Sequence, residues 1–447
     1  MPETNNQKTF QDCLFDLASN FIQAYSMNNG AFFVDNTPRR FHLFSIMNQV
    51  LFQKKDLQLA VLKTFLEIDE IRDFFGVTNL EDVLSNENSI YAIQTCVIDN
   101  SGSGGSQNPM MAITNIALSA IDSLVLEYGS FRKELLMTAI NKAFDNFKTF
   151  IHSEEVNEDH LVGFSGFQTD PDVVMGFGTV NAIAPNDFQS NYFFGGNNSR
   201  VGLIIREKYT RKMLFHGSQK EMEKFLQENN DIFNADSISK MHATVKNIRL
   251  SLVLALSKPD NLFYAFVEGD YLICSTGSLG SFIMRDPRML YKTSSEKLTQ
   301  HSVNKVSIKY LTITDNDLSS INIATNRLLS AVCGRDNPDD ALIDAVMCWE
   351  NIIGAESEVS FRICASIEKL LSATGRSIGE SDFKDLKSIY ESRSKLVHGN
   401  SNYRTDHKTV QLAIMYAIQL INAILEKRDL LTMKSKNRSK AILLGHE

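Results

Sequence analysis

Residues 410–425 read VQLAIMYAIQLINAIL, and this stretch decides how the C-terminal part of the chain must fold. Its main polar residues are Gln411, Gln419 and Asn422. Apolar side chains therefore occupy nearly every face of the helix that we expect at 407–428. Because a surface helix shows only one apolar stripe, this helix must be covered on several sides. A helical bundle that also forms a dimer through this helix would cover it.

The residues before this stretch also have helical periodicity. We expect helices at 316–333, 338–353, 356–372 and 382–398. The second of them starts at Asn337 or Pro338 and carries acidic residues in its first turn, where the positive end of the helix dipole favours them. The sequence therefore predicts an all-helical domain over residues 311–447.

Upstream of this domain the pattern changes to short β-prone runs separated by Gly, Asn and Pro. Examples are HLVGFSGF at 160–167 and RVGLIIREKY at 200–209. Helices are expected at 220–230 and 240–256, and FYAFVEGDYLIC at 263–274 is expected to form a hairpin that turns at Glu268-Gly269. Residues 156–310 are therefore predicted to form an α+β sensor or regulatory domain.

The N-terminal region, residues 1–155, has helical spacing at 9–28, 39–75 and 109–152. Pro109 fits the first turn of the last of these helices. Between them, DNSGSGGSQN at 99–108 has the composition of a flexible loop. The predicted fold class is multidomain α+β, with a helical N-terminal region, a middle α+β region and a C-terminal all-α bundle.

Composition places limits on the environment. The chain has 45 Lys and Arg against 53 Asp and Glu, so its overall charge does not indicate a nucleic-acid or membrane protein. Six scattered cysteines without a CxxC pair suggest neither disulfides nor zinc. The start has no secretory signal, and no apolar stretch is long enough to span a bilayer. We therefore expect a soluble, cytoplasmic protein with no membrane partner.

The last 56 residues are locally basic, with ten Lys and Arg against four Asp and Glu over 392–447. The segment KSKNRSK at 434–440 has two interpretations. It could follow an RNA backbone, or it could be a solvated terminus.

Arginine, four residues, histidine and glycine occur in this order twice, in RKMLFHG at 211–217 and in RSKLVHG at 393–399. The pattern alone is weak evidence in a chain with nine histidines. The first copy lies in the strand-rich region, where a surface strand ending in a turn explains it. The second copy closes a predicted helix and is followed by the long apolar helix.

With its helical surroundings, the second copy resembles the Apea-like branch of the HEPN superfamily over residues of about 321–425. The resemblance rests on an acidic helix start, a following helix and a final motif. The matching residues are Asp340, Leu342, Ile343, Asp344, Glu350, Glu358, Arg362, Tyr390, Arg393, Ser394, Val397, His398 and Gly399. HEPN families are often metal-independent endoribonucleases. The Apea-like proteins are associated with abortive infection in bacterial defence against phage.

The chemistry of the two motif residues agrees with this resemblance. Arginine offers a planar fork of donors to phosphate oxygens, and histidine takes and returns a proton near neutral pH. The resemblance implies that His398 is the general base or acid, that Arg393 stabilises the phosphorane, and that the 2′-hydroxyl of RNA is the nucleophile. Neither a metal nor another cofactor is then required. Ser394 would orient Arg393 or the phosphate, although a surface serine is an equally plain interpretation. Glu350 would support the site, but Glu350 and Arg362 are more often buried structural partners than catalytic groups.

Five residues at about 100° each place Arg393 and His398 about 140° apart on an ideal helix. One copy alone would therefore make a lopsided site, unless the helix loosens before Gly399. HEPN proteins bring two motifs face to face, so we expect a homodimer that acts on RNA. A regulated toxin would also need a trigger, either phage-derived or a small molecule. The alternatives are a non-catalytic HEPN scaffold that only dimerises and a ligand-sensing regulator.

Overall fold

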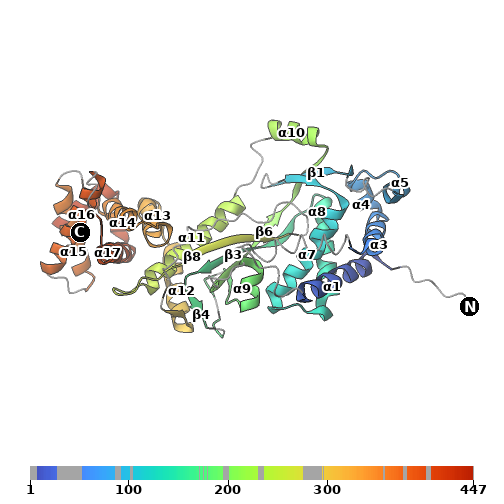
Figure 1. The fold of residues 1–447 in the computed structure, drawn as a ribbon. Helices are drawn as coiled ribbons and strands as arrows, with labels where there is room; N and C mark the ends of the chain where they lie inside the picture. The colour runs from blue at the N-terminus through green and yellow to red at the C-terminus, as the bar shows by residue number, and fades with distance from the viewer. Residues whose placement is uncertain are drawn as a thin grey trace, which may run out of the picture.

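The computed structural model describes residues 8–27, 53–85, 92–100, 104–170, 172–174, 176–178, 180–194, 201–229, 236–274, 294, 296–355, 358–375, 380–398 and 404–445. The chain is mostly helical with smaller sheets, a multidomain α+β protein. The sheet region lies between the N-terminal helices at one end of the molecule and the C-terminal helices at the other (Figure 1).

The α-helices of the first two regions are α1 (Phe10–Met27), α3 (Lys55–Leu66), α4 (Asp69–Phe74), α5 (Leu80–Ser85), α7 (Pro109–Tyr128), α8 (Leu136–Ile151), α9 (Asp187–Phe194), α10 (Gln219–Glu228), α11 (Asp236–Leu256) and α12 (Gln300–Thr314). A 3₁₀ turn, η1 (Lys133–Leu135), precedes α8. The strands are β1 (Thr95–Asp99), β2 (Gly104–Gln107), β3 (Val156–Ser165), β4 (Gln168–Thr169), β5 (Asn181–Ile183), β6 (Leu203–Arg211), β7 (Met213–Gly217), β8 (Phe266–Ile273) and β9 (Lys297–Leu298).

The C-terminal elements are the 3₁₀ turn η3 (Ser319–Ile321), α13 (Asn322–Leu329), the π-helical turn η4 (Ser330–Gly334), α14 (Pro338–Ile353), α15 (Val359–Ser372), α16 (Glu380–Val397), α17 (His407–Glu426), α18 (Arg428–Thr432) and α19 (Ser435–Leu444). The helices predicted at 338–353, 356–372, 382–398 and 407–428 are thus confirmed within a few residues.

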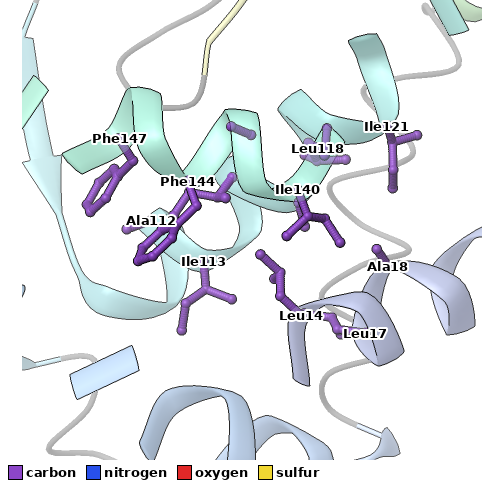
Figure 2. Packing of buried hydrophobic residues seen from close by; sticks show 14 of the residues in the cluster. Leu14, Leu17, Ala18, Ala112, Ile113, Leu118, Ile121, Ile140, Phe144 and Phe147 are labelled. Carbon is purple, nitrogen blue, oxygen red and sulfur yellow. The ribbon is translucent and has the colours of Figure 1, made fainter. Parts of the chain in front are cut away.

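The N-terminal helices pack around α7, which is apolar on most sides. Two features stabilise its first turn. Pro109 has no backbone N–H that would lack a partner there, and the Asn108 side chain accepts a hydrogen bond from the Met111 N–H at 2.9 Å. Its core neighbours come from α1 and α8, where Leu14, Ile140 and other apolar side chains meet those of α7 (Figure 2). The predicted helices at 9–28 and 109–152 are therefore confirmed, the latter as two helices.

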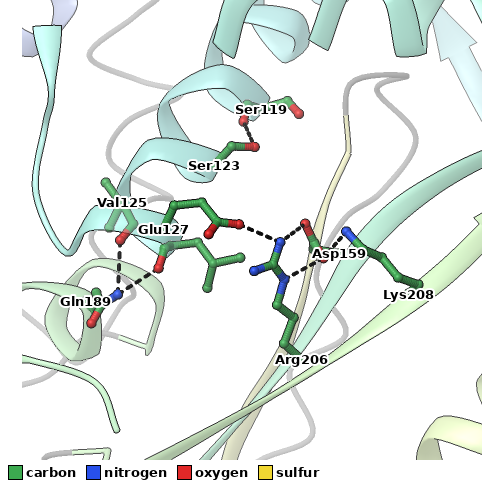
Figure 3. A network of polar contacts seen from close by, with 9 residues as sticks. Ser119, Ser123, Val125, Glu127, Asp159, Gln189, Arg206 and Lys208 are labelled. Carbon is green, nitrogen blue, oxygen red and sulfur yellow. Dashed lines mark hydrogen bonds and ion pairs between the residues drawn. The ribbon is translucent and has the colours of Figure 1, made fainter. Parts of the chain in front are cut away.

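The central sheet has the antiparallel order β5-β6-β3-β8. A polar network ties α7 to one face of this sheet (Figure 3). Arg206 binds Asp159 through Nε at 2.7 Å and reaches Glu127 at 2.7 Å, and Lys208 donates to Asp159 at 2.6 Å. Burial alone would raise the pKa of Asp159, but the bonds from Arg206 and Lys208 outweigh it and hold the pKa below its usual value.

Two local predictions for this region were wrong. Residues 104–107 are not loop but strand β2, which pairs antiparallel with β1 from Thr95↔Gln107 to Ile98↔Gly104; residues 101–103 lie outside the described part. Residues 266–273 are one strand rather than a hairpin. Gly163 pairs with Gly269 and Phe164 with Val267, so Glu268 is an extra residue that forms a bulge instead of a turn.

Helix α11 connects the sheet to the C-terminal bundle. Ile248 and Leu252 pack in one hydrophobic core with residues of the sheet. Leu250, Val253 and Leu254 pack in the core of the bundle. The α17 side chain of Asn422 donates to the Leu254 carbonyl at 3.2 Å. The second apolar face of α17 is therefore covered by the same chain, and the expectation that it needs a dimer interface was wrong.

The expectation that no apolar stretch is long enough to span a bilayer was wrong, because helices α7 and α17 are long and apolar enough by length and composition alone. Most of each lies buried inside the structure, as in the core helices of a soluble protein.

Candidate active site

The second arginine–histidine motif lies on α16, which packs against α14 in the bundle. Helix α14 starts sharply because Pro338 occupies its first turn and the Asn337 side chain accepts from the Asp339 N–H at 3.0 Å. These two helices position most of the residues discussed below.

Glu350 of α14 holds two residues of α16 at once. Its Oε1 accepts from the Tyr390 hydroxyl at 2.7 Å, and its Oε2 accepts from Arg393 Nη2 at 3.1 Å. Tyr390 and Arg393 are three residues apart, so they are neighbours on one helix face. Burial first, and then the bond to Glu350, raise the pKa of Tyr390, so its hydroxyl stays protonated and donates.

Arg393 and Glu350 are partly exposed, with 22% and 26% of their side-chain surface open to solvent. The Arg393 Nε is buried and has no hydrogen-bond partner within the described residues. The guanidinium is therefore held in place without all of its donors being satisfied.

His398 lies just after α16 and is exposed. Its backbone N–H donates to the Ser394 carbonyl at 3.0 Å, so the helical hydrogen-bond pattern continues to the histidine. Helix α16 therefore does not loosen before His398. Among the residues that the structure describes, no hydrogen bond or ion pair joins His398 to Arg393.

Ser394 follows Arg393 in the sequence and is half-buried. Its side chain makes no hydrogen bond in the described part of the chain. Gly399, the last residue of the motif, lies outside the described residues. One chain thus brings Glu350 and Arg393 together but leaves His398 apart.

Arg362, the other proposed structural partner, lies on the surface of α15. It faces Glu358 at 3.9 Å, four residues away, and both side chains are exposed. The expectation that Arg362 is buried was wrong, and only Glu350 of the two acts on the motif.

The first copy of the motif has a structural role. Arg211 is fully buried, and its Nε and Nη1 donate to Asp99 at 2.8 Å and Glu158 at 3.0 Å; Nη1 also contacts Cys274. Burial alone would lower the pKa of Arg211, but Cys274, Glu158 and Asp99 outweigh it and raise the pKa. The expectation of a surface strand was therefore wrong at this residue.

His216, the histidine of the same copy, stacks on Phe74 with ring centroids 4.5 Å apart. Its Nε2 lies 2.6 Å from the Phe74 carbonyl oxygen. This histidine fastens β7 to α4.

The basic C-terminal segment is not a solvated tail. It forms α19, and Arg438 in its middle is buried against main-chain carbonyls, including those of Leu430 at 2.7 Å and Ile352 at 2.9 Å. The Arg438 guanidinium is thus buried and hydrogen-bonded within the bundle, so it is not available to an RNA backbone.

A polar cluster that the sequence pattern did not predict surrounds Asp344, which is buried on α14. Its carboxylate accepts from Arg327 Nη1 at 2.6 Å, from the Ser330 hydroxyl at 2.7 Å and from Arg335 Nε at 2.7 Å. Burial alone would raise the pKa of Asp344, but these hydrogen bonds outweigh it and lower the pKa. The signal was an aspartate within the apolar run LIDAVMC, because a buried carboxylate needs partners.

No group of three or more His, Cys, Asp and Glu side chains in the described ranges is arranged to hold a metal ion. Comparisons of the chain with family models, curated proteins and solved structures found no match.

Proposed function

We propose that this protein is a metal-independent endoribonuclease of the HEPN type, with Arg393 and His398 as its catalytic residues. The observation that carries the proposal is the arrangement on α16. A partly exposed arginine is held by Glu350, and an exposed histidine follows it at the end of the same helix. The order of helices around it agrees with the resemblance described above.

In this reaction the 2′-hydroxyl oxygen of RNA attacks the adjacent phosphorus, and the bond from phosphorus to the 5′-oxygen breaks. His398 takes the proton of the 2′-hydroxyl or supplies the proton that the leaving 5′-oxygen needs. Arg393 stabilises the charge on the pentacoordinate phosphorus. The products are a 2′,3′-cyclic phosphate and a 5′-hydroxyl, and no oxidant or cofactor takes part.

The test of this proposal is incubation of the purified protein with total RNA, followed by mapping of the fragment ends. Fragments that carry 2′,3′-cyclic phosphates and 5′-hydroxyls support the proposal. Intact RNA, or fragments with 5′-phosphates, contradict it.

We expect RNA cleavage to persist in EDTA. The proposed reaction uses the substrate's own hydroxyl as nucleophile and protein side chains for charge and proton transfer. The measurement is the cleavage rate with EDTA and with added Mg²⁺ or Mn²⁺. A strict requirement for either ion would place the chemistry at a different site.

The active unit in this proposal is a homodimer whose two motifs share a site. The helical path from Arg393 to His398 is intact, so the two side chains point about 140° apart in one copy. An isologous contact brings two copies of each residue together. The exposed large apolar side chains of the bundle include Phe361 on α15 and Val397 next to the histidine, at 61% and 50%.

Mixing Arg393→Ala protein with His398→Ala protein is expected to restore part of the cleavage that each has lost. A mixed dimer holds one intact arginine and one intact histidine that face each other. The measurement is the cleavage rate of the mixture against each variant alone, together with the sedimentation of the wild type. A strictly monomeric wild type that cleaves RNA would refute the shared site. Ile418→Glu, a substitution on the apolar face of α17, is unsuitable as a dimer test because Ile418 is buried within its own chain.

The biological setting follows from the same proposal. An RNase of this kind damages its own cell unless it is restrained, so the remaining 1–310 region would hold it inactive until a phage-derived or small-molecule trigger appears. The protein would then act in the cytoplasm as a toxin in antiviral defence by abortive infection. The contact between α11 and α17 is one route by which the middle region touches the bundle.

A second candidate function is a non-catalytic scaffold or a ligand-sensing regulator. The observation in its favour is that Arg393 is already paired with Glu350, as a residue that only ties two helices together would be. Cleavage of RNA by the wild type together with its loss in His398→Ala would exclude this alternative.

A further inference from the structure

We propose that Glu350 is a positioning residue that keeps Arg393 in a charge-compensated resting pair, and that the phosphate of bound RNA has to displace its carboxylate. This inference rests on the function proposed above. In this proposal Glu350 controls the affinity for RNA, and the hydrogen bond from Tyr390 to Glu350 keeps the resting pair weak.

The geometry of the pair shows that it is incomplete. Arginine and a carboxylate can form two parallel hydrogen bonds. Here the pair has only one, from Arg393 Nη2 to Glu350 Oε2 at 3.1 Å, while Oε1 accepts from the Tyr390 hydroxyl at 2.7 Å. The bond from Tyr390 holds the carboxylate in this orientation and withdraws negative charge from it, which weakens its attraction for Arg393.

The pair is also open to solvent. Both side chains are more than one-fifth open to solvent, and water screens an ion pair in that position, so it contributes little stability. The buried Arg393 Nε also lacks an acceptor in the described residues, so the resting position leaves one donor unsatisfied. A phosphate, with several oxygens and a geometry suited to guanidinium, is a better partner than this carboxylate.

The negative charge of the pair also opposes RNA binding. In the resting pair the carboxylate cancels the positive charge of the guanidinium. An incoming phosphodiester therefore meets a neutral pair, and it gains the full attraction of Arg393 only once Glu350 has been displaced. Removal of the carboxylate charge should then strengthen RNA binding, whereas removal of a merely structural contact should not.

The experiment measures equilibrium binding of a short, fluorescently labelled, single-stranded RNA with 2′-O-methyl riboses, which the protein cannot cleave. Glu350→Gln keeps the shape of the side chain and an acceptor for Tyr390 but removes the charge. We expect RNA binding about threefold to fivefold tighter at low salt. The slope of log K against log salt concentration should steepen by about 0.7, as for one additional neutralised phosphate.

Three variants separate this mechanism from others. Glu391→Gln makes the same charge change on the solvent face of α16, where Glu391 is exposed and 4.0 Å from Lys387, and should leave affinity nearly unchanged. Tyr390→Phe frees Oε1 for Arg393 and should not tighten binding. In the double variant Glu350→Gln/Arg393→Gln the gain should disappear, because it acts through Arg393.

The outcomes for the two proposals are distinct. If wild-type protein cleaves RNA but Glu350→Gln binds no more tightly than Glu391→Gln, the resting pair is refuted and the ribonuclease stands. If the wild type cleaves no RNA but Glu350→Gln tightens binding through Arg393, the ribonuclease is refuted and the resting pair is supported. Absence of both effects overturns both.

Discussion

His398→Ala is expected to lower the rate of RNA cleavage by about 10²–10⁴, because loss of a general acid or base typically costs that much. This corresponds to about 3–5 kcal/mol in the activation barrier. His398 is exposed at the end of α16 and makes no side-chain hydrogen bond in the described residues, so the fold should be unaffected. The measurement is the single-turnover cleavage rate, with circular dichroism to confirm the fold.

The matched control is His301→Ala, because His301 is an exposed histidine near the start of α12, away from the motif. Its substitution should leave the rate unchanged. His216 is a poor control because it binds the Phe74 carbonyl and stacks on the Phe74 ring. A folded His398→Ala protein that cleaves at the wild-type rate would remove this residue from the mechanism.

Arg211→Met is expected to destabilise the sheet region by about 3–5 kcal/mol, the usual cost of breaking a buried ion pair by removing one partner. Asp99 and Glu158 are both almost completely buried, and Arg211 is their common cation. Its loss removes the cation that these two buried carboxylates share. The measurement is the midpoint of the first unfolding transition in urea or on heating.

The control for this prediction is Lys212→Met, which removes a positive charge at the next residue, where the side chain is exposed. It should change stability by less than about 0.5 kcal/mol. Equal midpoints for the two variants would contradict a structural role for Arg211. RNA cleavage by Arg211→Met protein that remains folded should match the wild type, since this copy of the motif is outside the proposed site.

The candidate site shows the limits of a spacing argument. The interval from Arg393 to His398 predicts that the two residues diverge, because helix geometry depends on local hydrogen bonds alone, and the bond from the His398 N–H to the Ser394 carbonyl continues the helix. The two arginine–histidine motifs have the same residue types at the same spacing, so the motif sequence alone does not tell which arginine is structural. One arginine is enclosed by two buried acids from different strands, and the other is held by one acid from a neighbouring helix. These partners lie 112, 53 and 43 residues away along the chain.

The sequence by itself determined the positions of the main helices in the bundle and the α+β class. Helix starts such as Asn337-Pro338 and the apolar periodicity of α14 and α17 depend on neighbouring residues, so they can be read locally. Only the tertiary structure decided what covers each face. It showed that α11 covers α17, that Arg438 is buried, and that Glu350 joins Tyr390 to Arg393. Burial and ion pairing arise from contacts between segments that are distant in the sequence. A local pattern of side chains does not specify which distant segment will pack against it.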